Sequence, residues 1–252
     1  MTVREHWSGK RMAERPLLIL GGTTLALALA KQLAARDIPA IYSLAGRTVP
    51  KALPDIEVRS GGFGGAEALR DYVQAKNIRA VIDATHAYAR QISLNAAATG
   101  HLLLRLSEEP WQQVVGDRWT AAEDISAARD VASAIADRVF VTTGRQGMDE
   151  FVHDNRCWWL ARVIAPGPDL DRGIYIQARG PFEKADELEL LRDHSIDAVI
   201  SKNAGGTATY PKIAAARELG LPVIMIDRAR SADTETVHTV EAAMAWISTL
   251  GA

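Results

Sequence analysis

The chain has 252 residues, of which 48% are hydrophobic, so it is long enough for one large or two small globular domains with buried cores. Its 29 basic and 31 acidic residues leave a net charge of -2, which excludes a global field that would favour nucleic acid or an anionic membrane. The apolar runs are too short to span a bilayer and the one cysteine, Cys157, excludes an internal disulfide framework, so we expect a cytoplasmic protein that binds neither nucleic acid nor membrane.

The first expected elements follow a polar N-terminal segment. Residues 1–15 lack the apolar core of a signal peptide and are expected to be a disordered extension. From residue 16, short aliphatic runs such as "PLLIL", "PAIYSL" and "RAVIDAT" alternate with longer segments of helical spacing. This βαβαβ alternation predicts a parallel sheet with helices on both faces, and Leu25, Leu29 and Leu33 are spaced to form the buried face of the first helix.

A polar stretch at residues 107–124 interrupts the alternation, which then restarts. We therefore expect an α/β protein of two Rossmann-like domains, with mainly parallel sheets and a ligand cleft between them. The expected domains are 16–115 and 116–252. The sequence leaves open that a terminal strand or helix crosses from one domain to the other.

The first strand leads into an altered dinucleotide-binding fingerprint. In the G-x-G-x-x-G motif the first glycine makes the tight turn, the second lets the pyrophosphate approach the backbone, and the third lets the helix pack on the strand. In this sequence these three positions are occupied by Gly21, Thr23 and Ala26. The Cβ of Thr23 blocks the usual approach, but the hydroxyls of Thr23 and Thr24 and the amides of the helix N-terminus are able to donate to a phosphate. A plain strand-to-helix turn with a threonine as its N-cap is the alternative.

The second strand ends in "YSLAGR", where an NAD site normally has a carboxylate for the ribose diol. With Ser43, Gly46 and Arg47 in its place, the site favours the 2'-phosphate of NADP, unless Arg47 is only a solvated turn residue. The third strand leads to "SGGFGG", residues 60–65, which suits close approach of a ligand or a mobile turn.

The fourth strand ends in "VIDATHAYARQIS", which places Asp83, Thr85, His86 and Tyr88 at the carboxyl edge of the sheet. Open α/β sheets bind ligands at this edge, so we expect these side chains to contact cofactor or substrate. Asp83 could equally cap the helix that follows.

The second half presents a basic residue at each of three comparable strand ends, namely Arg145, Arg179 and Lys202. Glycine or hydroxyl groups flank each of them, an arrangement suited to carboxylates or phosphates. No zinc-ligand spacing, nucleophile elbow or phosphate-loop lysine occurs, which argues against hydrolases and kinases.

The segments "ILGGTT", "SLAGR", "GGFGG", "VIDATHAYARQIS", "VFVTTGR", "ARGPF" and "SKNAGGTATYPKIAAARELGLPVIMI" occur in an order that resembles the precorrin-6A reductase family of cobalamin biosynthesis. Two motifs depart from the family pattern. Leu25 and Leu27 stand where that family has an acidic and a basic residue on the first helix, and Ala87 stands where it has proline after histidine.

The resemblance implies an enzyme that uses NADPH to reduce one double bond of the precorrin-6A macrocycle, giving precorrin-6B for hand-off to the next enzyme. Its carboxylate-rich tetrapyrrole substrate would account for the basic second edge. The expected cofactor residues are Gly21, Gly22, Thr23, Thr24, Ser43, Gly46, Arg47, Gly64 and Thr85. The expected substrate residues are Tyr88, Arg145, Arg179, Asn203 and Gly205, with His86 and Lys202 as the candidate catalytic groups and no metal.

Two other functions stay open at this point. A non-catalytic regulator that senses NADP would share the first domain, but it leaves the basic second edge unexplained. An NADP-dependent reductase of a small carbonyl compound would normally show Tyr-x-x-x-Lys, whereas Ile92 and Ala214 stand four residues after Tyr88 and Tyr210.

Overall fold

The structure is a computed structural model that describes residues 15–46, 55–145, 147–228 and 234–251. The chain divides into two units, one of Met1–Glu108 with Arg230–Ala252 and one of Glu109–Ala229. The pattern along the sequence predicts a boundary at residue 115, with all later residues in the second domain unless a terminal element crosses between domains. Most of the expected N-terminal extension lies outside the described residues; Arg15 is described and donates to the carbonyls of Asn77 and Ile78.

The first unit is built on a parallel sheet whose six described strands follow the order β12-β5-β4-β1-β2-β3. The strands are β1 (Leu17–Leu20), β2 (Ala40–Leu44), β3 (Glu57–Ser60), β4 (Val81–Asp83), β5 (Leu103–Leu106) and β12 (Thr236–Val237). Counted along the unit, this is the order 3-2-1-4-5-6 of dinucleotide-binding folds, with the C-terminal β12 as the sixth strand.

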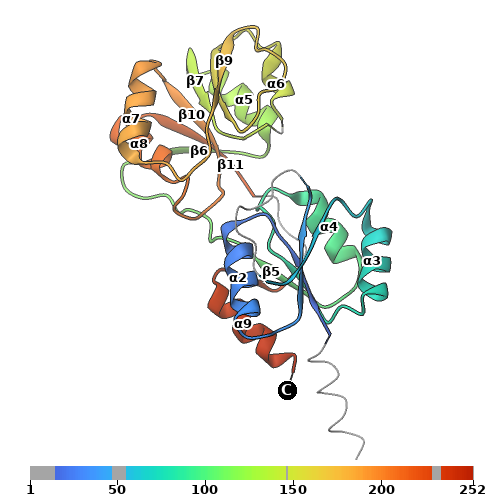
Figure 1. Ribbon diagram of the computed structural model, residues 1–252. Helices are drawn as coiled ribbons and strands as arrows, with labels where there is room; N and C mark the ends of the chain where they lie inside the picture. Colours follow the sequence, from blue (N-terminus) through green and yellow to red (C-terminus); the bar gives the residue numbers. More distant parts are fainter. Residues whose placement is uncertain (1–14, 47–54, 146, 229–233, 252) are drawn as a thin grey trace, which may run out of the picture. The chain divides into compact units, whose positions relative to one another are not determined.

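Helices cover both faces of this sheet. Figure 1 shows α2 (Thr24–Ala34) and α9 (Val240–Thr249) on one face, and α3 (Ala66–Ala75) and α4 (Arg90–Ala98) on the other. β1 is buried throughout, and its alternate side chains serve different cores: Leu17 and Ile19 pack with α2 and α9, whereas Leu18 and Leu20 pack with α3 and α4. The expected buried face of α2 is confirmed, because Leu29 and Leu33 lie in the first core and Leu25 packs against it.

The second unit has its own parallel sheet, whose six described strands follow the order β6-β11-β10-β7-β8-β9. The strands are β6 (Arg118–Ala122), β7 (Arg138–Val141), β8 (Trp158–Val163), β9 (Gly173–Gln177), β10 (Ala198–Lys202) and β11 (Pro222–Ile226). The run β9-β8-β7-β10-β11 repeats the 3-2-1-4-5 order of the first unit. The sixth position falls to β6, which comes from the start of this unit rather than from its end.

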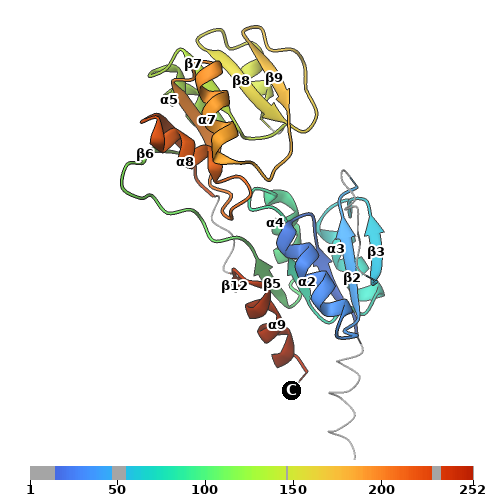
Figure 2. The ribbon, with the colours of Figure 1, turned by 60° about the vertical axis from the view of Figure 1, so that its left-hand side comes forward.

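Two helices pack on each face of the second sheet as well. α5 (Ile125–Ser133) and α6 (Asp149–Val152) cover one face, and α7 (Lys184–Asp193) and α8 (Pro211–Glu218) cover the other (Figures 1 and 2). The α7–α8 side encloses a core that includes Phe140, Leu160 and Ile213. The expected α/β architecture with parallel sheets is therefore confirmed for each unit.

The strand order decides where each unit is able to bind a ligand. In the first sheet, the chain continues from β1 toward one edge and from β4 toward the other, and β7 and β10 are related in the same way in the second sheet. A crevice forms outside the carboxyl ends of two neighbouring strands of this kind. The segments that follow these four strands contain most of the candidate site residues. Among the described helices, none has the length and apolar character needed to cross a membrane.

Candidate functional site

The turn after β1 is held by a network centred on the Thr23 hydroxyl. Thr23 is the N-cap of α2: its Oγ1 accepts from the Ala26 N–H at 3.1 Å and donates to the Ala84 carbonyl at 2.8 Å. The hydroxyl oxygen therefore caps α2, as the N-cap alternative predicts, and the hydroxyl proton links this turn to the residue that follows β4. A phosphate at this turn would meet Thr24 and the N–H groups of the first turn of α2, which have no acceptor inside the helix.

Gly21 and Gly22 are required here for different reasons. Gly22 has a φ of +120°, a conformation that favours glycine. Gly21 lies against Tyr42 of β2, and a Cβ at Gly21 would come within 2.5 Å of the phenol ring. Tyr42 is buried and its hydroxyl accepts from the Gly22 N–H at 3.3 Å, while burial raises the pKa of the phenol. No sequence motif indicates the role of Tyr42, which shapes the turn from the neighbouring strand.

Replacing Gly21 with alanine should lower the free energy of unfolding by about 1–3 kcal/mol, because the new methyl group overpacks a fully buried ring. Chemical denaturation measures this loss. Gly62→Ala is the matched control, since among the described residues no heavy atom beyond its chain neighbours lies within 4 Å of its Cβ position, and its stability should barely change. A smaller residue at position 42, as in Gly21→Ala/Tyr42→Val, should recover part of the loss; strictly additive effects would contradict the steric explanation.

The ends of β2 and β3 lie side by side and bring together groups of both strands (Figure 2). Ser43 is buried and its Oγ accepts from Nη1 of Arg59 at 2.9 Å. Gly46 has a φ of +88° and lies against Gly61, and Gly64, also at +88°, lies in the loop before α3. Arg47, the expected 2'-phosphate ligand, lies outside the described residues. Arg59 is thus the described guanidinium at this corner, and it is not part of any motif selected from the sequence.

The end of β4 contains a buried ion pair. Asp83 and Arg105 of β5 form a salt bridge with side chains only 2% and 8% exposed. Asp83 also accepts from the backbone N–H of Thr85 at 3.1 Å and from its hydroxyl at 2.7 Å, and Arg105 donates to Ser93 at 2.6 Å. Asp83 thus fixes the loop after β4 and does not cap α4, whose N-cap residue is Ala89. The hydroxyl of Thr85 is occupied inside this network.

His86 is exposed on the loop that this network fixes. Its Nδ1 accepts from the Tyr88 N–H at 3.3 Å, and the two rings lie 5.9 Å apart. In the neutral ring that bond places the proton on Nε2, which makes Nε2 the hydrogen-bond donor. The loop therefore presents an imidazole N–H and the Tyr88 ring at the carboxyl edge of the first sheet.

In the second unit, Lys202 lies at the end of β10, beside β7. Its Nζ donates to the Thr143 carbonyl at 2.7 Å, which bridges the two strands at the crevice, and burial lowers the pKa of its ammonium group. Arg145 and Arg179 are exposed in the segments after β7 and β9. The edge therefore presents cations from three strand ends of this unit.

The loop after Lys202 is fastened by Trp111, which lies just before β6. Both ends of the Asn203 amide bond the Trp111 backbone, at 2.7 Å to its N–H and 3.1 Å to its carbonyl, and the Trp111 indole donates to the Gly206 carbonyl at 2.7 Å. Gly205 is buried with a φ of +75°. Asn203 was expected to bind substrate, but the oxygen and the nitrogen of its side-chain amide both form hydrogen bonds that hold this loop.

A buried lysine completes the support of the same loop. Lys212 of α8 donates to the Thr209 carbonyl at 2.8 Å and lies 4.9 Å from the Trp111 ring. Desolvation lowers the pKa of its ammonium group to about 7, although Glu187 opposes that shift. Glu187 itself forms a buried salt bridge with Arg162 at 2.6 Å.

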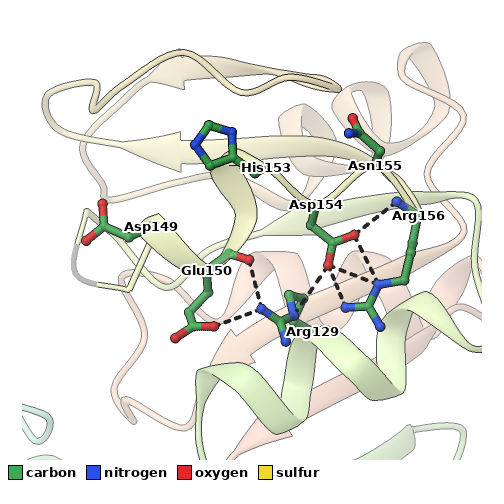
Figure 3. A pocket seen from close by; sticks show the side chains of 7 residues that line it. All are labelled: Arg129, Asp149, Glu150, His153, Asp154, Asn155 and Arg156. Carbon is green, nitrogen blue, oxygen red and sulfur yellow. Dashed lines mark hydrogen bonds and ion pairs between the residues drawn. The ribbon is translucent and has the colours of Figure 1, made fainter.

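The second unit also has a charged cavity of about 530 Å³ (Figure 3). It is lined by residues of α5, of α6 and of the segment leading into β8. Asp154 accepts from both Arg129 and Arg156, and Arg129 also pairs with Glu150, so these groups neutralise one another. We assign this network to stability and not to the candidate site.

The described residues contain no cluster of histidine, cysteine and carboxylate groups that could hold a metal ion. The candidate site residues lie at two carboxyl edges, one in each unit. The first has a helix N-terminus, Ser43, Arg59, His86 and Tyr88, and the second has Arg145, Arg179 and Lys202.

Comparison with known proteins gives one consistent family. Residues 16–248 match the family described as precorrin-6x reductase CbiJ/CobK. The precorrin-6A reductase of Rhodococcus erythropolis is 44% identical over 245 residues, which cover 93% of this chain and 98% of the relative. That of Rhodobacter capsulatus is 41% identical over 243 residues, covering 94% and 97%. A solved structure named CobK precorrin-6A reductase has a TM-score of 0.85 at 42% identity, covering 94% of this chain and 97% of that chain.

Proposed function

The chain belongs to the precorrin-6x reductase family, and we propose that it reduces one carbon–carbon double bond of precorrin-6A in cobalamin biosynthesis with NADPH as the hydride donor. NADPH supplies the hydride when bound, and a proton must come from the protein or from water. The expected cytoplasmic location and the hand-off of product to the next enzyme stay predictions.

The first carboxyl edge fits NADPH by the chemistry of its donors. At the end of β2, Ser43 and the Arg59 guanidinium occupy the corner where an NAD-specific site has a carboxylate. This is the observation that favours NADPH over NADH. The N-terminal turn of α2, with Gly21, Gly22 and Thr24, is the proposed pyrophosphate site, and its N–H groups and dipole favour negative charge.

The residues after β4 have positioning and proton-transfer roles in this proposal. Asp83 and Arg105 fix the loop, and the loop presents His86 and Tyr88 at the edge where the nicotinamide half of a dinucleotide binds. The Nε2–H of His86 is able to orient a carbonyl or carboxylate of the ligand. A protonated His86 would also be able to deliver the proton that completes the reduction.

The cations of the second edge suit the carboxylates of a tetrapyrrole. Lys202, Arg145 and Arg179 would anchor peripheral acetate and propionate groups through charge-assisted hydrogen bonds. Asn203, Trp111 and Lys212 keep the loop after β10 in place, so that Lys202 is presented from a rigid strand end.

The proposal is tested by following NADPH absorbance with purified protein and precorrin-6A. We expect NADPH to be oxidised only when precorrin-6A is present, in equal molar amount, and the tetrapyrrole to gain two hydrogen atoms by mass. Binding of NADPH without any oxidation would instead indicate the regulator. Oxidation with small carbonyl compounds alone would indicate the other reductase.

Substitution of Lys202 should separate anchoring from proton donation. If Lys202 anchors a carboxylate, as we expect, Lys202→Ala should raise KM for precorrin-6A by roughly 10- to 100-fold, and Lys202→Arg should keep most of the turnover because it keeps the charge. Steady-state kinetics at saturating NADPH measure KM for precorrin-6A and kcat. Lys31→Ala, which removes an exposed lysine of α2, is the control for the loss of a positive charge. A fall in kcat in both variants, with unchanged KM, would show that Lys202 is the acid instead.

A further inference from the structure

We propose that Arg59 determines the preference for NADPH, by binding the 2'-phosphate of the adenosine ribose together with Ser43. This inference rests on the proposed function, since it concerns the cofactor of that reaction. It names a residue that the sequence motifs did not select, on the edge strand β3 rather than after β2.

The position of Arg59 follows from the strand register. Arg59 pairs with Ser43 across the parallel β2–β3 ladder, one residue before the end of each strand. In dinucleotide-binding folds the adenosine ribose lies at the carboxyl end of the second strand. The Arg59 side chain therefore starts beside the expected ribose, and its Nη1 reaches the Ser43 hydroxyl at 2.9 Å.

The guanidinium is held in one orientation by neutral groups. Nη1 also donates to the Gly61 carbonyl at 2.9 Å, and Nη2 donates to the Gly62 carbonyl at 3.2 Å. One face of the group lies 3.8 Å from the centre of the Phe63 ring, which in turn packs edge-on against Tyr72. An arginine with a fixed fork loses little entropy when it binds an anion.

The charge of Arg59 is not neutralised by the residues that hold it. Within the described part of the chain, no carboxylate lies within ion-pair distance of Arg59, whereas Arg105, Arg162 and Arg217 each pair with one. Three of its five N–H groups are used by Ser43, Gly61 and Gly62, which leaves Nε–H and one Nη2–H. Two such donors form the fork that binds phosphate in a bidentate manner.

The backbone around the guanidinium leaves room for the ligand. For Gly61 and Gly62, no described heavy atom lies within 4 Å of the Cβ position. Phosphate is therefore able to approach the loop without displacing a side chain. The alternative is that Arg59 only fastens the loop to β2, and this alternative predicts equal effects on ligands with and without a 2'-phosphate.

The experiment measures binding without catalysis, by titrating adenosine 2',5'-bisphosphate, ADP, NADPH and NADH into wild type, Arg59→Gln and Arg59→Lys. We expect Arg59→Gln to weaken NADPH and the bisphosphate by roughly 10- to 100-fold while NADH and ADP stay within about twofold. Arg59→Lys should recover part of the loss because it keeps the charge without the fork. Arg36→Gln, an exposed arginine at the end of α2, is the control for net charge.

Each possible result of these titrations either supports or overturns the proposed role of Arg59. Equal weakening of all four ligands would show a loop fastener and overturn it, as would an unchanged NADPH preference in both Arg59 variants. If wild type binds NADPH and only the Arg59 inference fails, the proposed function stands. If wild type binds neither NADPH nor the bisphosphate, both fail. Should Arg59→Gln not fold, Ser43→Ala tests the same corner, with a smaller loss expected for NADPH and none for NADH.

Discussion

Replacing Asp83 with alanine should lower the free energy of unfolding by about 3–5 kcal/mol, because it leaves the buried Arg105 guanidinium without its carboxylate. The same change removes the acceptor of the Thr85 N–H and hydroxyl, so the loop that presents His86 should loosen as well. Chemical denaturation followed by circular dichroism measures the stability. Hydrogen exchange at residues 84–89 measures the loop.

Two further variants identify the cause of that loss. Glu57→Ala breaks the exposed Glu57–Lys76 pair and should change stability far less, since both side chains are about half exposed. Asp83→Leu/Arg105→Met removes the whole pair and should recover most of the lost stability while leaving the loop mobile. A loss for Asp83→Ala no larger than that of Glu57→Ala would contradict the buried-pair explanation.

The layout of the fold was accessible from the sequence because hydrophobic periodicity reports burial directly. Runs such as "PLLIL" are buried on both faces, as parallel strands are, and the glycine and hydroxyl clusters after them fall at carboxyl edges. The division of the chain was harder to infer. β12 is only two residues long, and no pattern in so short a strand reveals that it extends the first sheet.

The residues selected from the sequence lie mostly at carboxyl edges of the sheets, but the sequence did not indicate how the polar atoms of some of them are used. Thr23 and Asn203 lie at the expected edges, but their polar atoms are engaged by Ala84 and by the Trp111 backbone. Such partners come from distant parts of the chain, so spacing along the sequence does not reveal them. Two signals were nevertheless present: Arg105 interrupts the apolar run "LLLRL", and Arg59 immediately precedes "SGG" at the end of a strand.

Lys212 gave no comparable signal, because a lysine in the first turn of a helix is usually solvated. We nevertheless expect Lys212 to have the largest effect on how the stability of the protein depends on pH. In the folded protein its pKa is about 7, against 10.5 for an ordinary lysine. Between these values the unfolded chain holds a proton that the folded protein has released, so the free energy of unfolding should rise with pH. The slope from one such group approaches about 1.4 kcal/mol per pH unit. Below pH 7 the ammonium is charged in both states and the contribution is fully lost.

Lys212→Met removes this titration with little change in volume, so its stability should depend less on pH than that of wild type between pH 7 and 10. Burial also lowers the pKa of Lys202, which gives a slope of the same sign, so the informative quantity is the difference between wild type and variant at each pH. Lys31→Met, on the exposed surface of α2, controls for loss of a positive charge and should leave the slope unchanged. A difference between wild type and Lys212→Met that stays constant across this range would mean that Lys212 remains charged beside Glu187 and Trp111. Its bond to the Thr209 carbonyl would then be that of an ammonium group throughout, and the loop after β10 would be held equally at every pH.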